Sequence, residues 1–263
     1  MKLITLGSGS KGNSTFIESN NTKILIDSGL SFRETSKRLS SINVLPSTID
    51  AIFVTHEHCD HINGIPVFLK NSSNTKVYVH NPILHIVREK CQNIDPCRII
   101  GFENEIVLKD LVVKSFSVSH DSLDCVGYQV FDGKNYVGFA TDLGYFNQNI
   151  VDFLLPCSLV VLESNHDVQK LIKNPHYPMQ TKARILSGKG HLSNDQSAEL
   201  VYILAKNKVK QIILAHLSEE NNTPILAYKT ICDYLKTKNI IEGRDIFIDV
   251  STQNKVGNFF LIE

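Results

Sequence analysis

Short apolar runs rich in β-branched residues alternate with segments of helical periodicity along most of the chain. The runs predict strands over residues 2–6, 14–19, 22–27, 51–56, 76–80, 105–108, 111–120, 127–132, 135–141, 158–164, 211–216, 245–249 and 258–263. The periodic segments predict helices over residues 31–42, 64–71, 81–90, 193–208 and 223–238. Two of these helices begin with a capping box, formed by Ser31 with Glu34 and by Ser193 with Gln196.

The order of these elements predicts the fold class. Strands joined by tight turns open the chain, four strands follow one another near its middle, and strands and helices alternate elsewhere. No linker, low-complexity tract or repeat divides the sequence. We therefore expect a single α/β domain over residues 1–263, with two sheets packed face to face and helices outside. A doubly wound parallel sheet is the competing layout, but it fits the opening strands poorly.

A glycine-rich loop follows the first predicted strand. Its sequence "GSGSKG" places Gly7, Gly9 and Gly12 in the spacing of a dinucleotide-binding loop. Such a loop must lead into a helix, whose N-terminus then holds the pyrophosphate. Here a strand pattern, "STFIES", follows almost at once. We therefore expect the loop to turn a hairpin and to let the backbone approach another group closely.

Composition narrows the classes of partner. The 27 Lys and Arg balance the 27 Asp and Glu, so the net charge is zero and any site for a polyanion must be local. No apolar stretch approaches the length of a membrane span, and the N-terminus lacks the pattern of a signal peptide. The six cysteines are scattered without a C-x-x-C pair. We expect a cytoplasmic protein with free thiols and no membrane partner.

The stretch "VTHEHCDHING" carries the strongest chemical signal. His56 and His58 stand two apart in an extended segment, so they can project to one side. Asp60 and His61 follow a bend and can face a second point nearby. Imidazoles and carboxylates are the ligands of Zn, Mn and Fe, so two such groups suggest two divalent metal ions. The alternative is a histidine-rich surface loop without metal.

Further candidate ligands stand at the ends of other apolar strands. The predicted strands end in His120, in Asp142 and in His216. Each of these alone is more often an ordinary polar residue. Several strands that each deliver a His or Asp at the same end are what a site at the edge of a sheet requires.

Taken together, these motifs resemble the metallo-β-lactamase superfamily, whose fold is an αβ/βα sandwich with a dinuclear metal site between two sheets. A narrower resemblance to the WalJ/YycJ/VicX family of nucleases rests on "LGSGSKGNST", "THEHCDH", "VSHD", "ATDLG", "LESNHD", "GHLSN" and "LAHLSEENN" and covers almost the whole length. That family is associated with DNA exonuclease activity at 5′ ends. The resemblance implies one metal held by His56, His58 and His120, a second held by Asp60, His61 and His216, and Asp142 as the bridge.

Other residues are expected to act beside the metals. In such a site a metal-bound hydroxide is the nucleophile, and the catalytic residues are Asp60 and His191, of which His191 resembles the histidine that related nucleases bring to the scissile phosphate. Glu163, Asn165 and His166 follow an apolar strand and are expected to support ligands or contact substrate, with a structural role as the alternative. The predicted substrate contacts are Asn13, Asn165, His166, Lys182, Arg184 and Lys189.

A local excess of basic residues supports a nucleic-acid substrate. The segment 168–190 carries five Lys and Arg and no acidic residue, and it leads directly to His191. Such a run is often a solvated face, but here it could hold a polyanion against the metals. We therefore expect a metal-dependent phosphodiesterase acting on DNA rather than RNA. The alternatives are a hydrolase of small phosphodiesters or thioesters, and a regulatory or binding module with a vestigial site.

Overall fold

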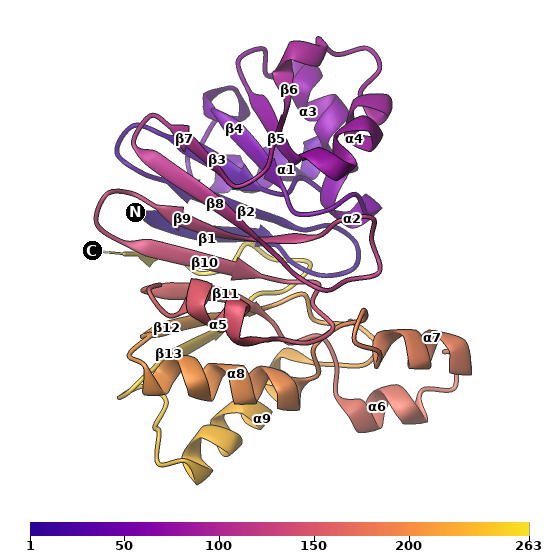
Figure 1. Cartoon of the computed structure of the whole chain (residues 1–263), viewed down its shortest axis with the longest axis vertical. Coiled ribbons are helices and arrows are strands. Elements are labelled where there is room, and N and C mark those ends of the chain that lie inside the picture. Colours follow the sequence, from indigo (N-terminus) through magenta and orange to yellow (C-terminus); the bar gives the residue numbers. More distant parts are fainter. Residues whose placement is uncertain (263) are drawn as a thin grey trace.

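Two seven-stranded sheets form the centre of the computed structural model, which describes residues 1–262 (Figure 1). The first sheet, in spatial order, contains β14 (Phe260–Leu261), β1 (Lys2–Gly7), β2 (Ser14–Glu18), β3 (Lys23–Ile26), β4 (Ala51–Val54), β5 (Lys76–His80) and β6 (Ile99–Phe102). The second contains β13 (Phe247–Val250), β12 (Gln211–Ala215), β11 (Leu159–Glu163), β10 (Tyr136–Ala140), β9 (Val126–Phe131), β8 (Leu111–Ser117) and β7 (Glu105–Leu108).

Helices cover the outer faces of both sheets, and Figure 1 shows the resulting layers. The helices are α1 (Phe32–Ser41), α2 (Cys59–Ile62), α3 (Ile65–Asn71), α4 (Leu84–Lys90), α5 (Gln148–Leu154), α6 (Val168–Lys173), α7 (Met179–Ile185), α8 (Asn194–Lys206) and α9 (Pro224–Thr237). α1, α3 and α4 pack on the first sheet, and α5, α8 and α9 pack on the second. α6 and α7 project from one end of the second sheet.

Apolar side chains from both sheets meet in a shared core. Phe53 of β4 stacks on Tyr78 of β5 with ring centroids 4.9 Å apart, and it meets Tyr128 of β9 edge-on at 5.9 Å. Phe53 and Tyr128 are fully buried. Truncating an aromatic side chain in such a position costs about 3–5 kcal/mol. This core therefore fixes the two sheets against each other, and with them the strand ends that carry the polar residues.

Strand direction collects those residues at one edge. β3 to β6 run parallel in the first sheet, and β10 to β13 run parallel in the second. Parallel strands present their C-terminal ends at the same edge, where the connecting loops build sites. The segments after β4, β10 and β12 therefore lead to a common region between the sheets.

The architecture confirms the predicted sandwich of two sheets with outer helices and excludes the single doubly wound sheet. The glycine-rich loop joins two antiparallel strands, as expected. The capping box at Ser193 is present, whereas at Ser31 the structure gives only the bond from Glu34 N to the Ser31 hydroxyl. Position 263 of the last predicted strand lies outside the described residues.

Several elements went unpredicted or differ in extent. β6, α5, α6 and α7 were not predicted, because each is only 4–7 residues long and shows no sustained period. β8 ends at Ser117, so His120 lies in the following loop rather than at the strand end. Among residues 1–262, no helix combines the length and apolar character needed to cross a bilayer.

Candidate metal centre

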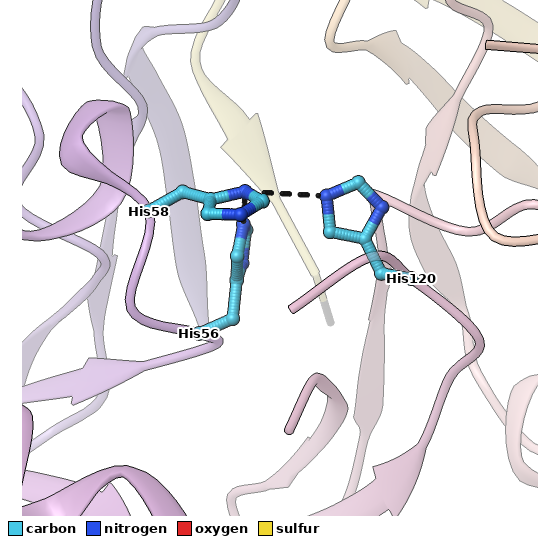
Figure 2. Close-up of side chains that lie close together, drawn as sticks. All are labelled: His56, His58 and His120. Atoms are coloured by element: carbon cyan, nitrogen blue, oxygen red, sulfur yellow. Dashed lines mark hydrogen bonds between the residues drawn. The ribbon is translucent and has the colours of Figure 1, made fainter. Parts of the chain in front are cut away.

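Three histidines from the two sheets form the first ligand cluster (Figure 2). His56 and His58 lie between β4 and α2, and His120 lies in the loop after β8. His56 Nε2 is 3.0 Å from His58 Nδ1, which is 3.3 Å from His120 Nε2. One nitrogen from each ring therefore faces a common point.

The protonation pattern of this cluster suits a cation. His120 Nδ1 is 3.2 Å from the Gly190 carbonyl oxygen, which can only accept, so the proton is on Nδ1 and the lone pair is on Nε2. Burial and the neighbouring histidines, His61 first, lower the pKa of His56 well below its usual value. Neutral imidazoles whose lone pairs converge are the ligands that divalent metals require.

A second cluster lies beside the first. The Asp60 carboxylate is 3.4 Å from His61 Nε2 and 3.5 Å from His216 Nε2. His216 Nε2 is buried and has no hydrogen-bond partner among the described residues. Such an orphaned nitrogen is costly unless a ligand meets it. The donor set of this cluster therefore also fits a divalent cation.

Asp142 lies between the two clusters. Its Oδ2 is 3.4 Å from His61 Nε2, and its Oδ1 is 3.8 Å from His120 Nε2. Oδ2 is buried and lacks a hydrogen-bond partner within residues 1–262. The Asp142 carboxylate therefore lies close to one candidate ligand atom of each cluster.

Strained backbone conformations occur at the same edge of the sheets, where the ligand clusters lie. Asp27, Asp142 and His216 have φ of 60°, 57° and 55°, values that non-glycine residues rarely adopt. Such conformations persist where surrounding contacts impose them, and they concentrate at functional sites. Close backbone approach adds a further constraint, because a Cβ on Gly29 would lie 1.6 Å from the Asp60 carbonyl oxygen. The chain around Asp60 therefore tolerates only glycine at position 29.

Buried carboxylates orient the histidines from behind. Asp27 accepts from His61 Nδ1 at 2.7 Å and from the Thr55 backbone at 2.8 Å. This contact directs His61 Nε2 towards the cluster. A carboxylate on the distal nitrogen fixes the tautomer of a metal-binding histidine and raises its basicity.

Glu163 provides a second and larger network. Its Oε1 accepts from His191 Nδ1 and from His216 Nδ1, each at 2.9 Å. Its Oε2 accepts from the Leu143 and Leu192 backbone amides, each at 3.0 Å. Burial opposes ionisation of Glu163, but the charges and hydrogen bonds of His191 and His216 outweigh it and lower its pKa. Glu163 therefore couples His191 to the second cluster.

A polar cavity of about 200 Å³ opens beside these residues. Its lining includes His191, Asn165, Ser10, Tyr177 and Arg184. Hydroxyl, amide, imidazole and guanidinium groups can all donate hydrogen bonds to phosphate oxygens. The cavity is therefore chemically suited to a phosphate ester next to the two clusters.

The predicted substrate contacts do not all meet at this cavity. Asn165 and Arg184 line it, and Asn165 also donates to the His216 carbonyl at 2.8 Å. Asn13 is buried within the second cluster, where its amide nitrogen is 3.2 Å from the Asp60 carboxylate. Lys182 donates to the Ile172 carbonyl and so ties α7 to α6.

The remaining two predicted contacts differ in exposure. Lys189 is exposed on the segment that leads to His191. His166 is buried, and its ring nitrogens lack partners among the described residues. Burial lowers the pKa of His166 to about 4. His166 therefore lies in the interior, and its contact with substrate stays a prediction.

Sequence reasoning missed Asp27 and left the role of Glu163 open. A usable signal existed for Asp27, because "IDSG" repeats the D-x-G pattern of "TDLG" after an apolar strand. Asp27 directly follows β3, and Asp142 lies two residues after the end of β10. No local pattern indicates that the Glu163 side chain points inward between two histidines.

Comparison with known proteins agrees with this geometry. Residues 22–217 match the beta-lactamase superfamily domain. The exodeoxyribonuclease WalJ of Streptococcus pneumoniae is 34% identical over 249 residues, which cover 93% of this chain and 91% of WalJ. The exodeoxyribonuclease YycJ of Bacillus anthracis is 32% identical over 240 residues, which cover 90% of each chain. These matches confirm the family resemblance that the sequence motifs predict.

A solved structure supports the fold independently. The Zn²⁺-bound PqqB of Methylobacterium extorquens superposes with a TM-score of 0.72 at 14% identity, covering 100% of both chains. At this identity the match speaks for the fold alone. From the two-sheet sandwich, the paired ligand clusters and the matched domain, we conclude that this chain belongs to the beta-lactamase superfamily of metallo-hydrolases.

Proposed function

We propose that this chain is a dinuclear metal-dependent phosphodiesterase that degrades DNA from 5′ ends. The observation that carries the proposal is the position of Asp142, whose buried oxygens face both ligand clusters. The exodeoxyribonuclease names of WalJ and YycJ, which align over most of the chain, support DNA as the substrate. The active unit would be the single domain of residues 1–263, and a cytoplasmic location remains a prediction.

The proposed ligands divide between the two clusters. The first ion would be held by His56, His58 and His120, the second by Asp60, His61 and His216, and Asp142 would bridge them. Zn, Mn and Fe all suit this donor set. When bound, the ions would supply Lewis acidity towards a phosphoryl oxygen and an activated water.

The chain's own residues would position the ester and move a proton. His191 lines the cavity and donates through Nδ1 to Glu163, so its Nε2 could protonate the leaving alkoxide only from the doubly protonated ring. Burial opposes that charge, but the Glu163 carboxylate outweighs burial and raises the pKa of His191. Asn13, which touches the Asp60 carboxylate, would hold this ligand in place rather than contact substrate. Asn165 and Arg184 would contact the phosphate ester, and Lys189 a neighbouring phosphate of the polymer.

A direct test uses metal-stripped protein resupplied with Mn²⁺ or Zn²⁺. Duplex and single-stranded DNA and RNA, labelled at either end, should show release of mononucleotides first from the 5′ end of DNA. Asp142→Ala should abolish this release. Products that appear first at 3′ ends, or faster from RNA, would contradict the proposed specificity.

A hydrolase of small phosphodiesters is the alternative, and the modest cavity of about 200 Å³ is the observation that favours it. Turnover of bis-nitrophenyl phosphate without any cleavage of DNA would select that alternative. Binding of DNA without turnover of either substrate would instead indicate a vestigial site.

A further inference from the structure

Asp121 directly follows His120 in the sequence, and the two oxygens of its carboxylate have different surroundings. Its Oδ2 accepts a hydrogen bond from Arg184 Nε. Its Oδ1 is 3.3 Å from His120 Nε2. Oδ1 is buried and has no hydrogen-bond partner among residues 1–262. Asp121 Oδ1 therefore lies beside the Nε2 ligand atom of His120 without a hydrogen-bond donor.

Both atoms of the contact between His120 Nε2 and Asp121 Oδ1 act as hydrogen-bond acceptors. The Gly190 carbonyl holds the proton of His120 on Nδ1, so the lone pair of Nε2 faces the cluster. The Asp121 side chain forms an ion pair through Oδ2 with the permanently charged guanidinium of Arg184. Two electron-rich atoms at this distance repel each other unless a cation lies close to both. The arrangement accordingly calls for positive charge at the cluster.

We infer that Asp121 is an additional ligand for the cation held by His56, His58 and His120. The inference rests on the proposed function, because it assumes that this cluster binds a metal. Three neutral imidazoles supply no charge to a divalent ion, and the Asp142 carboxylate would be shared with the second ion. Asp121 would add a further ligand atom and an unshared negative charge. The unpartnered Asp121 Oδ1 lies 3.3 Å from His120 Nε2, and Asp142 Oδ1 lies 3.8 Å from the same nitrogen.

Arg184 is then a positioning residue that connects this ligand to α7. Its side chain is 59% exposed, so the ion pair with Asp121 contributes little to stability, and its effect is to orient the carboxylate. The structure gives only Nε of Arg184 a protein partner within the described residues, which leaves the two terminal nitrogens for a phosphate of the substrate. Substrate contact at α7 and metal affinity at the three-histidine cluster are thereby coupled.

Titration of metal-free protein with Mn²⁺, with free ion followed by electron paramagnetic resonance, tests this inference without reference to activity. His58→Ala identifies which binding step belongs to the three-histidine cluster. Asp121→Asn should weaken that step about 10- to 100-fold and leave the other step unchanged. Asp124→Asn is the matched control, because Asp124 lies in the same loop but pairs with His80.

The possible outcomes separate the two hypotheses. Wild-type protein that binds no Mn²⁺ would overturn the proposed function. Two binding steps in wild-type protein that Asp121→Asn leaves unaltered would overturn only the role of Asp121. Arg184→Gln should weaken the same step to a smaller extent. A stronger step in that variant would mean that Arg184 competes for the carboxylate, which refutes its positioning role. Circular dichroism verifies that each variant is folded.

Discussion

Replacing Glu163 with Gln changes no side-chain volume but removes the charge from the centre of a buried network. Each carboxylate oxygen of Glu163 accepts two hydrogen bonds, Oε1 from two histidines and Oε2 from two backbone amides. A Gln side chain must place its NH₂ group against one of these donor pairs, whichever way the amide is turned. As long as both histidines keep their protons on Nδ1, two of the four hydrogen bonds are therefore lost in either orientation.

The magnitude follows from this count. A hydrogen bond to a charged group contributes about 1.5–3 kcal/mol, so two of them give an upper range of about 3–6 kcal/mol. Removing one partner of a buried charged network typically costs about 3–5 kcal/mol. We expect the free energy of unfolding of Glu163→Gln to fall by about 3–5 kcal/mol, because Glu163 is fully buried and relaxation is limited.

Urea denaturation of the metal-free protein measures this loss. The same substitution at Glu105 is the control, because Glu105 is half-exposed and pairs with Lys114 at 3.4 Å on the surface. That variant should change the free energy of unfolding by less than about 1 kcal/mol. A loss below about 1 kcal/mol in Glu163→Gln would refute the reasoning, since the network would then contribute no more than a surface pair.

Three further predictions concern metal, polymer and thiols. Elemental analysis should find two metal ions per wild-type chain. Asp142→Ala should lose more bound metal than His216→Ala, because Asp142 faces both clusters. Equal losses of metal in the two variants would contradict the bridging position. Lys189→Ala should reduce the slope of log affinity against log salt for duplex DNA by about 0.9 for one lost phosphate contact, and an unchanged slope would make Lys189 a merely solvated residue. Burial raises the pKa of Cys157 to about 12, so at pH 8 this thiol should stay protonated and resist iodoacetamide, while the exposed Cys59 reacts. Mass spectrometry identifies the labelled cysteine. Equal labelling of Cys157 and Cys59 in the folded protein would contradict the burial of Cys157.

The sequence by itself determined the two-sheet sandwich and the first set of candidate ligands. Strand patterns are short-range signals, and the H-x-H-x-D-H motif concentrates four candidate ligands within six residues, so both can be recognised locally. The sequence was also sufficient to predict that the His and Asp residues after several apolar strands lie near one another, because parallel strands bring their C-terminal ends to one edge of a sheet. The position of His120, three residues beyond its strand, still fell within that reasoning.

Only the tertiary structure decided how these ligands are supported and what surrounds them. Glu163 reaches His191 and His216 across 28 and 53 residues of chain, and Asp121 reaches Arg184 across 63. No local period encodes such contacts, because they depend on how β11, β12 and α7 pack against one another. The same packing places the Asn13 amide against Asp60 and the Lys182 ammonium against the Ile172 carbonyl of α6, contacts that the sequence did not predict. Side-chain direction at the sheet edge is a property of the assembled layers, and residue type alone does not specify it.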